Sequence, residues 1–224
     1  MKIDRTAAAE PRYAELHCVS NFSFLQGASH PEELVSRAAA LGYDALALTD
    51  RATLSGIVRA HGAAKQAGIK LVIGAHLKPI DAPPIVVWAT NAAGYSNLCQ
   101  LLTHGSTRAA EHAAQPAASR ADDEHFSPSS EGGCRLTLDD TARFSHGLLA
   151  GMPLAGCGLA EQVRPFDHSR LQTTVAHLAR WRQIFGDRLC GLAEVALEGD
   201  DADRLAWFGC VAHHAGVPVA AAGD

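Results

Sequence analysis

The feature that most constrains the fold of this chain is a repeated alternation of short apolar runs with amphipathic segments. Strand-like runs are predicted at residues 13–18, 45–49, 69–74, 85–89, 148–152, 189–197 and 218–222. Helical spacing of apolar side chains predicts helices at residues 31–41, 54–66, 95–103, 169–185 and 202–215. Strand and helix units repeating about every 30 residues are typical of an α/β protein with a parallel sheet. A count of seven strands favours closure of that sheet into a barrel.

The composition is consistent with a packed α/β domain and excludes several other classes. Apolar residues make up 47% of the chain, which is enough for a substantial core. The formal net charge of -5 argues against a free-standing nucleic-acid-binding protein, which would normally carry a basic face. The six cysteines lie far apart and form no CxxC pair, so we expect free thiols rather than a zinc knuckle or a disulfide framework.

Targeting signals are not apparent in the sequence. The first 12 residues are charged, lack the apolar run of a signal peptide and are expected to be flexible. No stretch approaches the ~18 apolar residues of a membrane span. We therefore expect a cytoplasmic protein without membrane contact.

One region interrupts the alternation. Residues 105–133 are dominated by Ala, Ser, Pro, Gly and charged side chains, which predicts a flexible surface insertion. His112 and His125 in this region are interpreted as solvated rather than as ligands. The remaining residues from 13 to 224 are expected to form one domain.

Polar side chains of the metal-binding type recur where the predicted strands end. His17, Asp50, His76 and Asp224 follow or close the first, second, third and last strands. Because the carboxyl ends of parallel strands meet at one edge, these groups could converge on Zn²⁺, Mn²⁺ or Fe. The competing interpretations are a purely structural His17 and an Asp50 that caps the following helix. The four positions together indicate a metal site or its remnant.

Three stretches resemble a known family. AELHCVSNFSFLQGASHPEELVSRAAALGYDALALTD looks like the start of the PHP (polymerase and histidinol phosphatase) domain of bacterial C-family DNA polymerases, and GIVRAHGAAKQAGIKLVIGAHL and WATNAAGYSNLCQLL continue it in order. The segment NFSFLQGASHPEEL is most similar to the error-prone branch of this family. The resemblance covers residues 12–104 and, more loosely, 134–224. It implies a distorted (βα)7 barrel with a cluster of two or three metal ions at the carboxyl ends of the strands, and phosphoester hydrolysis in active members.

The first two metal motifs of the family are altered here. An intact first motif is HxH, whereas this chain has Val19 in place of the second histidine after His17. The second motif pairs Asp with His, whereas Asp50 is followed by Arg51, a permanent cation.

The later metal motifs of this chain also differ from those of the family. The family's metal-bridging glutamate on the third strand is replaced by His76, and the closing Asp-x-His motif stops at Asp224. The resemblance therefore predicts a vestigial metal site at His17, Asp50, His76 and Asp224, a barrel incomplete at its carboxyl terminus, and no catalytic residue. A divalent metal (Zn, Mn or Mg) would bind weakly or not at all.

The leading functional hypothesis is the amino-terminal PHP region of an error-prone, translesion DNA polymerase, serving DNA replication and repair. Its partners would be the palm and thumb of the parent polymerase, and it would meet DNA only through that enzyme. The palm carboxylates that hold two Mg²⁺ for nucleotidyl transfer would lie outside this chain. The alternatives are a self-contained metal-dependent phosphoesterase and a non-catalytic remnant that at most binds a partner.

Overall fold

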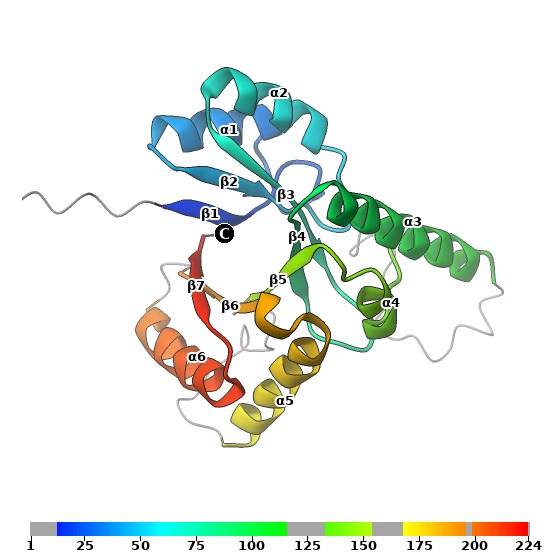
Figure 1. Ribbon diagram of the computed structural model, residues 1–224, viewed down its shortest axis with the longest axis vertical. Coiled ribbons are helices and arrows are strands. Elements are labelled where there is room, and N and C mark those ends of the chain that lie inside the picture. The colour runs from blue at the N-terminus through cyan, green and yellow to red at the C-terminus, as the bar shows by residue number, and fades with distance from the viewer. Residues whose placement is uncertain (1–12, 116–132, 154–167, 196–198, 224) are drawn as a thin grey trace, which may run out of the picture.

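The computed structural model describes residues 13–115, 133–153, 168–195 and 199–223. Its seven strands form one sheet whose spatial order follows the chain order (Figure 1). The strands are β1 (Ala14–Cys18), β2 (Ala45–Leu48), β3 (Lys70–Leu77), β4 (Ile85–Ala89), β5 (Leu148–Pro153), β6 (Leu189–Glu194) and β7 (Val219–Ala222). The sheet curves until β7 lies beside β1, which confirms the predicted α/β barrel.

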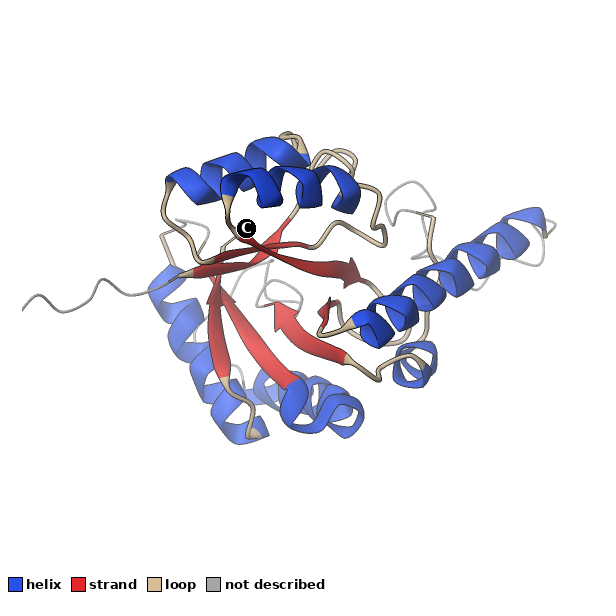
Figure 2. Ribbon diagram, turned by 45° about the horizontal axis from the view of Figure 1, so that its top comes forward, coloured by secondary structure: helices blue, strands red, loops and turns tan. Residues whose placement is uncertain are grey.

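Helices surround the barrel on its outer side. They are α1 (Pro31–Ala40), α2 (Ile57–Ala67), α3 (Ala92–Ala114), α4 (Leu138–Arg143), α5 (His168–Phe185) and α6 (Asp201–Ala215). In Figure 2, α1 and α2 lie side by side over one edge of the barrel, and α3 extends away from it. The helices α5 and α6 pack together beside β5, β6 and β7 (Figure 1).

The direction of β4 departs from the prediction of a parallel sheet. β4 runs antiparallel to both β3 and β5, whereas the other four pairings are parallel. Residues 78–84, which join β3 to β4, contain no helix. A parallel crossover needs a dozen or more residues, so this short connection can only reverse the chain.

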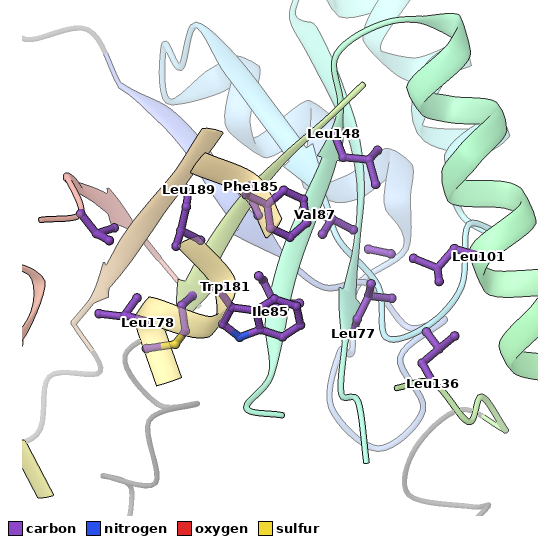
Figure 3. Close-up of a cluster of buried hydrophobic side chains, with 14 of the residues drawn as sticks. Leu77, Ile85, Val87, Leu101, Leu136, Leu148, Leu178, Trp181, Phe185 and Leu189 are labelled. Atoms are coloured by element: carbon purple, nitrogen blue, oxygen red, sulfur yellow. The ribbon is translucent and has the colours of Figure 1, made fainter. Parts of the chain in front are cut away.

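The core is divided between the outside and the inside of the barrel. The largest cluster packs the outer face of the sheet against α3, α5 and α6, and Figure 3 shows its large side chains, among them Trp181 and Phe185. A second cluster joins α1 and α2 to β2, with Val35 and Leu48 almost fully buried. A third, smaller cluster fills the barrel with Ala47, Val86, Trp88, Leu192 and Ala222. Because the interior residues come from β2, β4, β6 and β7, closure of the sheet brings together distant parts of the sequence.

The predicted insertion begins later than expected. Residues 105–114 continue α3 as helix, so the prediction that residue 105 begins a flexible segment is wrong; residues 116–132 lie outside the described residues. Two contacts hold this part of α3 in place. A β-carbon on Gly105 would lie 2.4 Å from the Cys134 sulfur, and Arg108 pairs with Asp140 at 2.5 Å. Tertiary packing therefore stabilises residues 105–114 as helix although their composition is typical of a disordered segment.

Candidate functional site

His17 lies inside β1, next to its carboxyl end, and its ring contacts a carboxylate on β6. Its Nδ1 donates to Oε1 of Glu194 on β6 over 2.8 Å. Both side chains are buried, with 6% and 9% of their surfaces exposed. Its Nε2 is buried without a hydrogen-bond partner among the described residues. In the tautomer that carries its proton on Nδ1, Nε2 has a lone pair available for a further contact.

The side-chain alternation along β1 is interrupted near its carboxyl end. The register with β2 shifts between Glu15 and Cys18. Leu16 therefore packs in the interior cluster, whereas Cys18 packs against the α1 and α2 cluster outside. These two side chains lie on different faces because a register irregularity changes which face later residues occupy. Cys18 is therefore a packing residue on the outer side of β1.

Asp50 follows β2 as predicted, but its carboxylate faces the loop that connects β1 to α1. Its two oxygens accept hydrogen bonds from the Ser20 backbone N–H (2.7 Å), the Ser20 hydroxyl (2.8 Å) and the Ser23 hydroxyl (2.7 Å). Only 2% of the residue is exposed. The N-cap of α2 is Gly56, so Asp50 does not cap that helix. Asp50 anchors the loop by satisfying donors that are themselves buried.

His76 lies within β3, one residue before its end, and its ring meets that of His17 edge to face with centroids 5.1 Å apart. Burial, together with the nearby basic side chains of His17, Arg51 and Lys78, lowers the pKa of His76 to about 3. The ring is therefore neutral at pH 7. Arg51, Lys78 and His76 line a small hollow with Cys134 and Leu136. The surroundings of His76 are cationic, which disfavours a bound metal ion.

The described residues do not fit a tightly held metal ion. His17 offers one ring nitrogen, and His76 lies beside it. The oxygens of Asp50 are taken up by two serines. Among residues in the described part of the chain, no group of three or more His, Cys, Asp or Glu side chains converges as metal ligands. A stable site requires three or four such ligands. Asp224 lies outside the described residues.

Two acidic residues near this site were not predicted to belong to it. Glu194 binds His17, and Glu15 accepts hydrogen bonds from the backbone N–H groups of His17 (2.8 Å) and Gly223 (3.0 Å) and from the Tyr13 hydroxyl (2.9 Å). Each is a charged residue in a strand made mostly of apolar residues, which is the signal that could have singled them out.

Comparison with known proteins identifies the family. The family model of the PHP domain matches residues 15–192. This chain belongs to the PHP domain family. Its seven-stranded α/β barrel agrees with the fold that the resemblance implied.

Curated relatives of this PHP domain are error-prone DNA polymerases. The chain is 36% identical over 216 residues to the enzyme of Rhodopirellula baltica, 40% over 222 residues to that of Ralstonia nicotianae and 38% over 215 residues to that of Pseudomonas fluorescens. These matches cover 95–96% of this chain but only 17–18% of the relatives. The chain thus corresponds to one region of a much longer polypeptide in these relatives.

Solved structures agree on the fold. A candidate metal-dependent phosphoesterase from Bifidobacterium adolescentis superposes with a TM-score of 0.58 at 14% identity, covering 94% of this chain and 86% of its own. An amidohydrolase from Chromobacterium violaceum gives a TM-score of 0.60 at 18% identity, with the same coverage.

Within the described ranges, the helices are too short or too polar to cross a bilayer.

Proposed function

We propose that this PHP domain is the PHP region of an error-prone DNA polymerase, and that it contributes structure rather than metal-dependent hydrolysis. The polymerase acts in the cytoplasm in translesion synthesis during replication and repair. Nucleotidyl transfer takes place in its palm, which lies outside this chain. The PHP region packs on the palm and thumb and reaches DNA only as part of that enzyme.

The structural role is supported by the hydrogen bonds that the candidate metal ligands form within the protein. Asp50 holds the Ser20 and Ser23 donors, and Glu194 holds His17. At Asp50, hydrogen bonds from the protein occupy both oxygens that a metal would need, whereas at His17 they occupy only Nδ1. Arg51 adds a fixed positive charge directly after Asp50. These contacts support a barrel that is stabilised by its own side chains.

A metal-dependent phosphoesterase is the second candidate. It is favoured by the Nε2 of His17, which has no hydrogen-bond partner in the described part of the chain, because a histidine held at Nδ1 by a carboxylate is a common arrangement for a metal ligand. The metal content of the purified chain separates the two candidates.

The decisive experiment measures bound metal and phosphate release on the same sample. The 224-residue chain is prepared in buffers with Zn²⁺ or Mn²⁺, passed over a desalting column and assayed for metal and for hydrolysis of p-nitrophenyl phosphate and a 3′-recessed DNA. We expect substoichiometric metal and no hydrolysis above that of the His17→Ala variant. Stoichiometric metal, with phosphate release that His17→Ala abolishes, would show that the second candidate is correct.

The polymerase role is tested in a full-length chimera. Residues 1–224 replace the matching region of the Ralstonia nicotianae relative, which is 40% identical to this chain over 222 residues. We expect the chimera to extend primers on undamaged and damaged templates, and a version lacking the region to lose this activity. A chimera that behaves like the deletion would contradict the proposal.

A further inference from the structure

The loop between β1 and α1 displays apolar side chains to solvent. We call residues 19–29 the β1–α1 loop. Phe24 is 80% exposed and Leu25 is 89% exposed, and Phe22 beside them is 38% exposed. Adjacent, strongly exposed large apolar residues are uncommon on a protein that acts alone, and they mark contact surfaces.

The loop that carries these side chains is built rigidly. Its backbone is closed by hydrogen bonds from Asn21 to Ser29 (2.9 Å), from Ser23 to Ser20 (2.9 Å) and from Gly27 to Ser23 (3.0 Å). The Ser23 hydroxyl donates to Asp50 and accepts from the Arg51 N–H at 3.0 Å, which ties the loop to β2. The exposed side chains thus project from a fixed base rather than from a loose segment.

One backbone position of this loop is strained, and another leaves room only for glycine. Leu25 has a φ of 63°, a left-handed conformation that a leucine rarely adopts. Gly27 packs so closely that an added β-carbon would lie 2.0 Å from the Ser20 carbonyl oxygen. Strain that is held in place by surrounding hydrogen bonds is typical of functional segments.

The charge of the loop indicates the class of partner. Residues 19–29 contain no Lys or Arg. Single-stranded nucleic acid is bound by aromatic side chains combined with basic ones that contact phosphates, and anionic membranes also require basic residues. An apolar protein surface needs neither, so it is the occupant that this loop fits.

The architecture indicates where that surface comes from. The strands other than β4 run in one direction, so polypeptide that continued beyond β7 would leave the barrel at the end where the β1–α1 loop lies. The relatives carry more than four-fifths of their length outside the matched region. Resting on the proposed polymerase function, we infer that Phe24 and Leu25 insert into an apolar surface of the polymerase part of the same polypeptide.

The test uses the full-length chimera with the Ralstonia nicotianae relative. A photoreactive benzoylphenylalanine replaces Phe24, or Val58 in a matched control, since Val58 is 81% exposed on α2. After irradiation, cross-linked peptides are identified by mass spectrometry. We expect position 24 to cross-link to peptides outside the exchanged region, several-fold more than position 58. In parallel, Phe24→Ser with Leu25→Ser should lower the unfolding temperature of the chimera, whereas Val58→Ser should not.

The outcomes separate this inference from the function on which it rests. If the unsubstituted chimera synthesises DNA but position 24 cross-links no more than position 58, the docking inference is wrong and the polymerase role stands. Cross-links from position 24 to DNA, or between two copies of the chimera, would also overturn it. If the unsubstituted chimera is inactive, the polymerase role fails and the docking inference falls with it.

Discussion

Strand β1 is held by different kinds of contact on its two sides. Toward β2 it forms a parallel ladder, extended by a hydrogen bond from the Thr49 N–H to the Cys18 carbonyl oxygen at 2.8 Å. Toward β7 and β6, the described residues show no strand pairing with β1, and the contacts are made by side chains. Glu15 accepts from the Gly223 N–H, and His17 donates to Glu194. We call this second junction the seam of the barrel.

The two sides of β1 differ in how well they should tolerate amino-acid substitution. A backbone ladder can be supplied by almost any amino acid, so it tolerates substitution. The seam depends on two carboxylates, and a substitution at either one leaves buried donors without an acceptor. Asp50 belongs to the ladder side, where it adds a side-chain anchor that joins the β1–α1 loop to β2. The following predictions test whether the two sides differ in this way.

The largest effect is expected for Asp50→Ala. This change leaves the Ser20 N–H and the two serine hydroxyls buried without an acceptor, which should lower the free energy of unfolding by about 3–4 kcal/mol. Urea denaturation of the 224-residue chain measures it. The exposed Asp203→Ala serves as the matched control and should change stability little. A loss below about 1 kcal/mol would mean that the anchor does not hold the loop.

A smaller effect is expected at the seam for Glu15→Ala. It removes the acceptor for three donors, but Gly223 and Tyr13 are only partly buried and can turn to water, so the loss should be about 2 kcal/mol. Glu15→Gln keeps one acceptor oxygen and should recover about half of it. The same urea measurement applies. A larger loss than that of Asp50→Ala would mean that the seam depends on Glu15 more than the β1–α1 loop depends on its Asp50 anchor.

The coupling between His17 and Glu194 is expected to be weaker again. A double-mutant cycle with His17→Phe and Glu194→Leu should give a coupling energy of about 1–2 kcal/mol, because both side chains are buried. The ion pair between Arg59 and Glu32, which joins α2 to α1, is a control whose partners are 46% and 39% exposed. Its cycle should show no measurable coupling. Equal coupling in the two cycles would remove the distinction between buried and exposed pairs.

The smallest effect is expected in local opening of the seam, which thiol labelling of buried cysteines can measure. Burial raises the pKa of Cys190 on β6 and of Cys134 to about 11 each. At pH 8 roughly one thiol in a thousand is ionised at such a pKa, so both should react slowly, and about tenfold faster for each unit of pH increase below 11. The exposed Cys210 should react first.

The same labelling is then repeated in the Glu15→Ala variant, and the modified cysteines are identified by mass spectrometry. Labelling of Cys190 should accelerate because the seam opens beside β6. Labelling of Cys134, which is packed under α3, should stay unchanged. Equal acceleration at both cysteines would show that the variant loosens the whole barrel.

Much of the fold could be predicted because it depends on local pattern. The strand at residues 85–89 and the helix that begins at Pro31 are found as predicted, since apolar periodicity and an N-terminal proline act within a few residues. The direction of β4 was not predicted, although the short connection before it carried the information. The length of α3 was underestimated because Gly105 and Ala109 are held in the helix by contacts with residues far along the chain.

The sequence by itself determined the family, the seven strands and the placement of His17 and Asp50 at strand ends, because strand periodicity and motif order are properties of neighbouring residues. Only the tertiary structure decided what those residues contact. Glu194 lies 177 positions from His17, and Gly223 lies 208 positions from Glu15. These pairs meet because the sheet closes, and closure depends on the packing of all seven strands together. Whether a carboxylate holds a serine, a histidine or a backbone N–H is therefore fixed by long-range geometry that no local pattern contains.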